Sequence, residues 1–196
     1  PAFLFGTLAE DPLCLFQRIG DLVCGEVSNG MILAADCSED DVKVLFVDPS
    51  VPAGSRIHGA QTSKKRMFEI VAAHGIPYAA TASVGYPEDY LAKVEKAMNT
   101  DGASYIHVMA PCPTGWGTAS DLTVELGKEA VDCGLWYLAE YEDGEFKLNR
   151  DPKEFTSVEE YLKKQGRFSA MDDADIAQVV EERNSAWARM RRDWKK

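Results

Sequence analysis

The sequence has little positive charge, no long apolar run and few cysteines. Its 196 residues carry 21 Lys and Arg against 32 Asp and Glu, a formal net charge of -11. Binding to phosphate needs clustered Lys and Arg, so this balance argues against a nucleic-acid-binding protein. No apolar stretch approaches the ~18 residues of a membrane span, and the opening stretch PAFLFGTLAEDPLC lacks the basic region that begins a signal peptide. We therefore expect a cytoplasmic protein without a membrane span.

The cysteines do not form the pattern of a secreted disulfide framework. There are five, an odd number, and no Cys-x-x-Cys pair is present. The cysteines are therefore expected to be either reduced thiols or metal ligands. Cys112 stands out because it lies between two prolines in the stretch HVMAPCPTGW, at the end of an apolar run. That is an unusual place for a packing residue.

Length and composition favour one well-buried domain, with 45% hydrophobic and 27% charged residues. Strand and helix patterns alternate, which predicts a layered α/β fold with a largely parallel sheet. An Asp143-Gly144 pair predicts a hairpin. The carboxyl edge of an open parallel sheet is where ligands bind, and the strand 104–110 brings Cys112 to that edge. Other strands are expected at 42–48 and 77–82, and helices at 64–74, 87–98 and 120–134, the last capped by Ser120.

The chain leaves this repeating pattern after residue 150. Ser157 and Glu160 predict a capped short helix that ends at Gly166, and Asp172 begins a long final helix. We therefore expect an α/β domain over 1–150 and a C-terminal helical extension over 151–196 that makes subunit contacts. Its basic end, RMRRDWKK, either meets an acidic partner subunit or complements the helix dipole in solvent. The side chains expected on one face of the final helix are Ile176, Val179, Arg183, Trp187, Met190 and Trp194.

Three stretches carry a resemblance to a known family: AAHGIPYAATASVGYPEDYLAKVEKAMNTDGASYIHVMAPCPTGWG, ELGKEAVDCGLWYLAEYEDGEFKLN and VEEYLKKQGRF. Together they resemble the C-terminal half of the thiamine-diphosphate-binding beta subunit of pyruvate and related 2-oxoacid:ferredoxin oxidoreductases, over about residues 64–168. The resemblance implies a three-layer thiamine-diphosphate-binding-type α/β fold. It also implies a subunit that works with alpha-, gamma- and delta-type subunits to decarboxylate a 2-oxoacid. Electrons then pass through 4Fe-4S clusters to ferredoxin, and coenzyme A takes the acyl group.

By this resemblance Cys112 is a ligand of a 4Fe-4S cluster. In the family, the cysteine of the corresponding loop binds the cluster near the thiamine, and three other ligands come from the N-terminal part of the subunit. Soft thiolates suit such clusters. Cys14, Cys24 and Cys37 do not match the family's spacing, so three alternatives stay open. They bind the cluster together with Cys112, they are packing residues, or the other cluster ligands are cysteines of another chain. Cys133 is expected to be a buried packing residue.

The thiamine motif departs from the family's pattern. The family has Gly-Asp-Gly and later Tyr-Asp-Asn, whereas this sequence has GDL and VDP. The resemblance assigns Gly20, Asp21 and Asp48 to thiamine diphosphate and its Mg²⁺, which need a closely approaching backbone and hard oxygen ligands. Leu22 crowds that turn, and Pro49 has no N–H to donate. The alternative is that Asp21 is a loop acid and Asp48 caps a strand.

Three functional classes therefore stay open. The first is a beta-type subunit of a 2-oxoacid:ferredoxin oxidoreductase, and the second is a non-catalytic beta-like subunit that has lost thiamine diphosphate and serves as a structural partner. The third is a free-standing α/β ligand-binding domain. His58, beside Arg56 in a glycine-bearing loop, is a candidate contact for an anionic substrate, although most loop histidines have no such role. His74 and His107 are expected to be structural.

Overall fold

The computed structural model of the chain describes residues 31–36, by their backbone, and residues 66–194. Several residues singled out in the sequence lie outside these ranges, and so does the strand expected at 42–48. Their assignments stay predictions. The residues concerned are Cys14, Gly20, Asp21, Leu22, Cys24, Cys37, Asp48, Pro49, Arg56 and His58.

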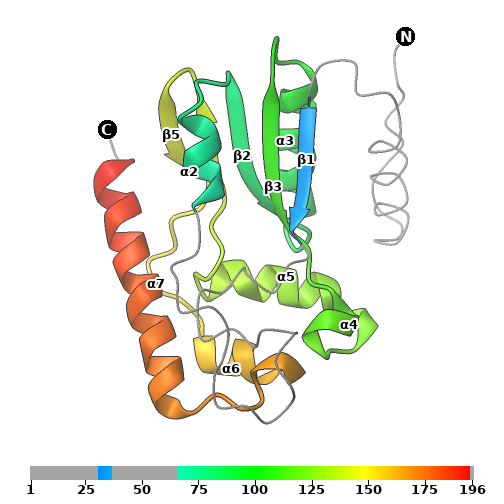
Figure 1. The fold of residues 1–196 in the computed structure, drawn as a ribbon, viewed down its shortest axis with the longest axis vertical. Coiled ribbons are helices and arrows are strands. Elements are labelled where there is room, and N and C mark those ends of the chain that lie inside the picture. The colour runs from blue at the N-terminus through cyan, green and yellow to red at the C-terminus, as the bar shows by residue number, and fades with distance from the viewer. Residues whose placement is uncertain (1–30, 37–65, 195–196) are drawn as a thin grey trace.

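Within the part of the chain that the structure describes, five strands form one sheet in the order β1-β3-β2-β4-β5 (Figure 1). β1 (Met31–Asp36), β3 (Ser104–Met109) and β2 (Tyr78–Ser83) run parallel to one another. β4 (Ala139–Glu142) pairs antiparallel with β2, and β5 (Glu145–Leu148) pairs antiparallel with β4. The sheet is therefore mixed, which corrects the expectation of a largely parallel sheet.

The predicted hairpin is the reason for the mixed sheet. Asp143 and Gly144 both have a positive φ, 51° and 88°, as a two-residue hairpin turn of type I′ requires. The turn reverses the chain between β4 and β5. The hairpin is confirmed, and it adds two antiparallel strands beside the parallel ones.

Helices cover both faces of the sheet. On one face, α3 (Pro87–Met98) packs on a cluster that includes Ile106 of β3. On the opposite face, α2 (Met67–Ala72) brings Phe68 against Tyr105 of the same strand (Figure 1). Successive side chains of a strand point to opposite faces, so neighbours in β3 serve different layers. Both β2 and β3 are buried along their whole length, which confirms the layered α/β arrangement.

α2 turns the face that carries Phe68 toward the sheet. Phe68 and Ala72 are buried, whereas Met67 and Ile70 are 37% and 43% exposed. The helix is also shorter than the expected 64–74. It ends at Ala72, two residues before the expected end, and the turn that follows it reaches Gly75, whose φ is 72°.

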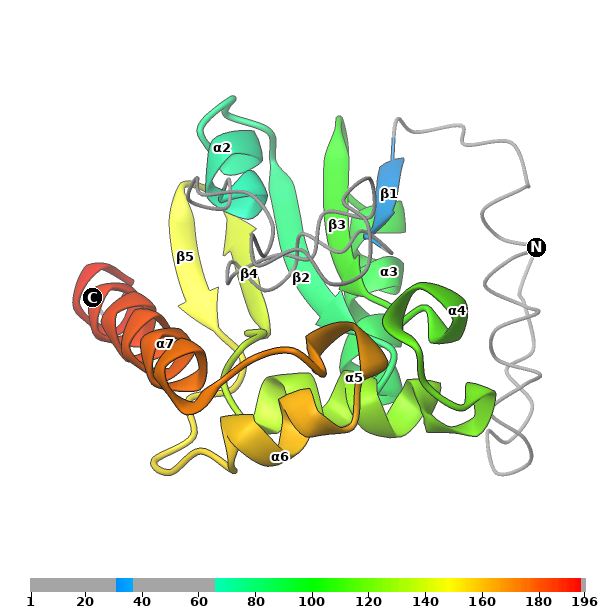
Figure 2. The same ribbon diagram turned by 60° about the horizontal axis from the view of Figure 1, so that its bottom comes forward.

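Two helices lie beneath the ends of the parallel strands, α5 (Thr123–Asp132) and α6 (Val158–Lys163), packed side by side (Figure 2). Ser157 caps α6, since its hydroxyl accepts a hydrogen bond from the N–H of Glu160 at 3.2 Å. Ser120 does not cap α5. It begins a short 3-10 turn ahead of the helix and makes no capping contact with its side chain.

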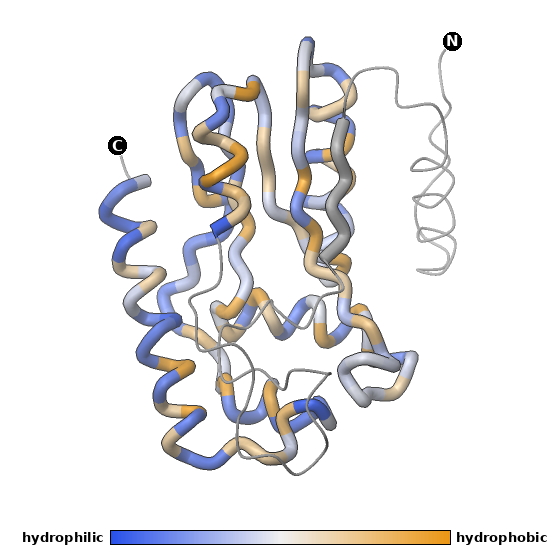
Figure 3. The backbone as a smooth tube through the Cα atoms, in the orientation of Figure 1, coloured by the Kyte–Doolittle hydropathy of each residue, from blue (hydrophilic) through white to orange (hydrophobic). Residues whose placement is uncertain are grey.

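The final helix, α7 (Asp173–Asp193), begins at a capping box formed by Asp172 and Asp175. Val179 and Trp187 are among its buried residues, which confirms the predicted face, and the rest of the helix is largely hydrophilic (Figure 3). No helix in the described ranges is both long enough and apolar enough to cross a membrane.

The basic end of α7 forms ion pairs within the chain. Arg189 binds Glu69 of α2 at 2.8 Å, and Arg191 binds Asp151 at 2.7 Å. The helix therefore lies against its own domain. A boundary at residue 150 and subunit contacts made by 151–196 stay predictions.

Candidate functional site

The Cys112 loop, residues 110–118, follows β3 at the carboxyl edge of the sheet. It contains α4 (Pro113–Trp116), a single turn in which the N–H of Trp116 donates to the carbonyl oxygen of Cys112 at 2.9 Å. A proline in the first position suits such a turn, because its φ is already helical. Gly117 ends the turn with a φ of 65°. Cys112 therefore stands at the start of a hydrogen-bonded turn.

Of the two cysteines in the described ranges, Cys112 is the accessible one. It is partly exposed, and its Sγ lies 3.8 Å from the position that a Cβ on Gly115 would take. Cys133 is fully buried, and its Sγ lies 3.5 Å from the carbonyl oxygen of Ala130. Burial raises the pKa of the Cys133 thiol to about 12. Cys133 is thus a packing residue, as predicted, and Cys112 is the thiol that a metal can reach.

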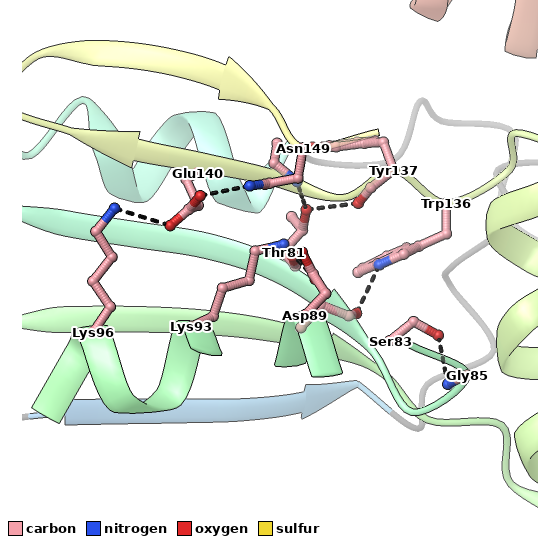
Figure 4. Close-up of polar contacts among 12 residues, drawn as sticks. Thr81, Ser83, Gly85, Asp89, Lys93, Lys96, Trp136, Tyr137, Glu140 and Asn149 are labelled. Atoms are coloured by element: carbon pink, nitrogen blue, oxygen red, sulfur yellow. Dashed lines mark hydrogen bonds and ion pairs between the residues drawn. The ribbon is translucent and has the colours of Figure 1, made fainter. Parts of the chain in front are cut away.

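A second loop, after β2, is pressed against α5. The hydroxyl of Ser83 donates to the carbonyl oxygen of Gly127 at 2.7 Å. It also accepts from the N–H of Gly85 at 3.2 Å (Figure 4). A Cβ on Gly85 would lie 2.0 Å from the backbone nitrogen of Lys128. Only glycine fits at such a distance. This contact fixes α5 at the end of β2, beneath the edge that carries the Cys112 loop.

Residues 165–168, here called the clamp segment, pack against the Cys112 loop at Trp116 and Gly117. The N–H of Gly166 donates to the carbonyl oxygen of Gly117 at 3.3 Å. The guanidinium carbon of Arg167 lies 3.7 Å from the centroid of the Trp116 ring and 4.5 Å from that of Phe168. Sequence reasoning did not identify this contact, because its two halves are far apart in the chain.

Two buried polar atoms of the Cys112 loop have no hydrogen-bond partner among the residues that the structure describes. They are Nε1 of Trp116 and Oγ1 of Thr118. Buried donors without a partner cost free energy and call for an explanation. Sulfur atoms of a metal cluster accept such hydrogen bonds. These donors are compatible with a cluster bound next to the loop.

Cys112 fits one ligand position of an iron–sulfur cluster, because it offers an accessible soft donor on a rigid turn. No group of three or more His, Cys, Asp or Glu able to hold a metal ion is present in residues 31–36 and 66–194. The remaining ligands would therefore come from cysteines beyond these ranges or from another chain. The candidate thiamine residues also lie beyond these ranges, so the described part does not test them.

A polar cluster at the opposite end of β2 was not foreseen from the sequence. Glu140 accepts hydrogen bonds from Nζ of Lys96 at 3.1 Å and from Nδ2 of Asn149 at 2.5 Å (Figure 4). It also accepts one from the hydroxyl of Tyr78 at 2.9 Å. Burial by itself raises the pKa of Glu140, but these hydrogen bonds outweigh it and lower that pKa overall. We call these four residues the Glu140 cluster.

Two further buried groups lie against the sheet. Nζ of Lys93 donates to the carbonyl oxygen of Thr81 at 2.8 Å and pairs with Asp89 at 2.6 Å, while burial lowers its pKa. The spacing of Asp89 and Lys93, four residues apart on a helix, was the available signal for this pair. The ring of His107 packs edge-on against Trp136 at 4.8 Å between centroids, and His107 is buried, in keeping with a structural role.

Comparison with known proteins identifies relatives of the chain. It is 47% identical over 128 residues to pyruvate synthase subunit PorB of Methanocaldococcus jannaschii, which covers 65% of this chain and 43% of that protein. It is 43% identical over 145 residues to ketoisovalerate oxidoreductase subunit VorB of Pyrococcus abyssi, covering 73% and 47%. To PorB of Thermotoga maritima it is 45% identical over 134 residues, covering 68% and 41%. No family model matches the chain.

The chain thus spans less than half the length of the curated relatives it matches. Identities of 43% to 47% over 128 to 145 residues are far above what unrelated sequences show. They confirm the resemblance that the sequence motifs indicated. Over about two thirds of its length, the chain is homologous to the PorB and VorB beta subunits of 2-oxoacid:ferredoxin oxidoreductases.

Proposed function

We propose that this chain carries the Cys112-loop region of a beta-type subunit of a 2-oxoacid:ferredoxin oxidoreductase, acting on pyruvate or a related 2-oxoacid. The observation that carries the proposal is the homology to subunits named pyruvate synthase and ketoisovalerate oxidoreductase. The position of Cys112 at the carboxyl edge of the sheet supports it. The helix layers on both faces and the parallel order β1-β3-β2 support a thiamine-diphosphate-binding-type fold.

In the proposed enzyme, thiamine diphosphate supplies the decarboxylation chemistry and the 4Fe-4S clusters carry single electrons toward ferredoxin. The part of this chain is to hold a thiolate in place. Cys112 offers the ligand, and it packs against a buried core cluster that includes Trp116 and Phe168. The contact between Gly85 and α5 keeps the edge of the sheet rigid beneath the loop. Gly20, Asp21 and Asp48 remain the candidates for thiamine diphosphate and Mg²⁺.

The partners follow from the same proposal: alpha-, gamma- and delta-type subunits, ferredoxin, coenzyme A and the 2-oxoacid. Native mass spectrometry of the anaerobically isolated complex tests it, because one spectrum reports partner chains and bound cofactors together. Partner chains with thiamine diphosphate and iron are the expected result. Partner chains without thiamine diphosphate would instead identify a non-catalytic beta-like subunit.

Substitution of the cysteine tests the metal role directly. Cys112→Ser should lower the iron and acid-labile sulfide content of the purified complex, because a hydroxyl is a poor ligand for the cluster. Cys133→Ala is the matched control, since Cys133 is buried away from solvent and should leave the iron content unchanged. Full iron in the Cys112→Ser complex would overturn the assignment.

A further inference from the structure

We propose that Arg167 is a positioning residue for Cys112. Its guanidinium plane holds Trp116, and Trp116 in turn fixes the one-turn helix that begins at Cys112. The significance of this for metal binding rests on the function proposed above. The contacts themselves lie wholly within the described residues.

The guanidinium of Arg167 packs against two aromatic rings and forms a hydrogen bond through its Nε. Its central carbon lies 3.7 Å from the ring of Trp116 and 4.5 Å from the ring of Phe168. Nε of Arg167 donates to Oε1 of Gln165 at 3.0 Å. Gln165 is buried and donates to the carbonyl oxygen of Tyr161 in α6 at 3.1 Å. Through Gln165, α6 therefore contributes to the orientation of the guanidinium.

The Trp116 ring depends on this stacking. It is fully buried, and its Nε1 makes no hydrogen bond within the described part of the chain. Within that part, packing alone orients the ring. The N–H of Trp116 binds the carbonyl oxygen of Cys112 at 2.9 Å, and a close-packed interior transmits small shifts. A change in the position of Trp116 is thus passed to the residue that carries the thiol.

A backbone contact lies next to the stacked pair. The N–H of Gly166 donates a hydrogen bond to the carbonyl oxygen of Gly117, with a nitrogen–oxygen distance of 3.3 Å. A Cβ on Gly117 would lie only 3.2 Å from Cα of Gly166. The absence of both side chains lets the two segments approach closely enough for Trp116 and Arg167 to stack. The clamp segment therefore fixes the Cys112 loop by backbone and side chain together.

The experiment compares Arg167→Leu with Arg192→Leu in the metal-free full chain. Arg192 is 70% exposed and pairs with its neighbour Asp193, so it is a matched arginine outside the clamp. The measurement is the alkylation rate of each cysteine, resolved by mass spectrometry. Arg167→Leu should raise the rate at Cys112 by roughly five-fold, the ratio that a cation–π contact of ordinary strength implies. Arg167→Lys should give an intermediate rate, and Arg192→Leu the unchanged rate.

Cys133 serves as an internal reporter of folding, because it is fully buried in the same core. An unchanged rate at Cys112 in Arg167→Leu would overturn the proposal. So would an equal rise at Cys112 and Cys133, since that indicates general loosening and not a displaced loop.

A second readout uses the iron-loaded complex. Arg167→Leu should keep its iron but change the electron paramagnetic resonance signal of the reduced cluster, because the thiolate now points in another direction. An identical signal would contradict the positioning role. If Cys112→Ser keeps full iron, the proposed function fails, while the alkylation rates still decide whether the clamp positions Cys112.

Discussion

The two ends of β2 are held by different kinds of interaction, as Figure 4 shows. At the carboxyl end, Ser83 and Gly85 meet the backbone of α5 with no room for a Cβ. At the other end, the Glu140 cluster joins β2 to its neighbours through hydrogen-bonded polar side chains. The first arrangement depends on shape and the second on charge. The contact of Ser83 and Gly85 with α5 therefore involves no ionisable side chain, whereas the Glu140 cluster depends on one.

The largest effect is expected from filling the space at the carboxyl end. Gly85→Ala places a Cβ 2.0 Å from the backbone nitrogen of Lys128, and a backbone cannot rotate away as a side chain can. The free energy of unfolding should fall by about 3 kcal/mol or more. Urea unfolding followed by circular dichroism measures it.

Gly75→Ala provides the control for that substitution. Gly75 has a φ of 72° but nothing within 4 Å of its added Cβ, so only backbone strain of about 1 kcal/mol is expected. If both variants lost the same free energy of unfolding, the close approach of Gly85 to α5 would not be what holds the carboxyl end of β2.

A smaller effect is expected at the charged end. Glu140→Gln replaces the carboxylate that accepts three hydrogen bonds, and should cost about 2 kcal/mol at neutral pH. The pKa of Glu140 in the folded protein is below its ordinary value of 4.5. Its contribution is therefore present above that value and is lost as the pH falls through the folded pKa. Wild-type protein should lose stability on acidification more steeply than Glu140→Gln.

Glu142→Gln is the matched control at this end. Glu142 pairs with the same Lys96 at 2.6 Å, but its side chain is 48% exposed, so its loss should cost less than about 1 kcal/mol. Thermal unfolding over a series of pH values tests both variants. Parallel pH profiles for wild type and Glu140→Gln would contradict the role given to the Glu140 cluster.

Of the three test substitutions, apart from their controls, the smallest effect is expected from Ser83→Ala, which leaves the carbonyl oxygen of Gly127 without its 2.7 Å donor. The loss should be about 1 kcal/mol and should not change with pH, because no charge is involved. Ser104→Ala is a suitable comparison, since that buried hydroxyl makes a longer bond of 3.3 Å to Ala97. A pH-dependent loss in Ser83→Ala would break the distinction between the two ends.

Local signals in the sequence predicted much of the fold. The helix expected at 87–98, the Asp143-Gly144 turn and the start of the final helix at Asp172 each depend on neighbours in the chain, and each is confirmed. The sequence did not indicate which face of α2 turns inward, because Phe68 packs in a cluster with Tyr105 and other residues distant in the chain. The same reason hid the Glu140 cluster, whose members come from two strands, a helix and a loop.

At the candidate site, the sequence placed Cys112 correctly at the carboxyl edge of the sheet and Cys133 correctly in the core. It gave no indication of the clamp. Trp116 and Arg167 each look like ordinary members of separate segments, and only the close approach of Gly117 to Gly166 brings them together. Gly20, Asp21 and Asp48 stay predictions.

The contact between α2 and α7 forms only after the C-terminal end of the chain has been synthesised. Arg189 binds Glu69 across 120 positions of the chain, and Trp194 packs edge-on against Phe68. Contacts of such separation raise contact order and slow folding. While α7 is still being translated, the apolar face that receives Trp194 is open to solvent, and chaperones that recognise apolar surface have access to it during that interval.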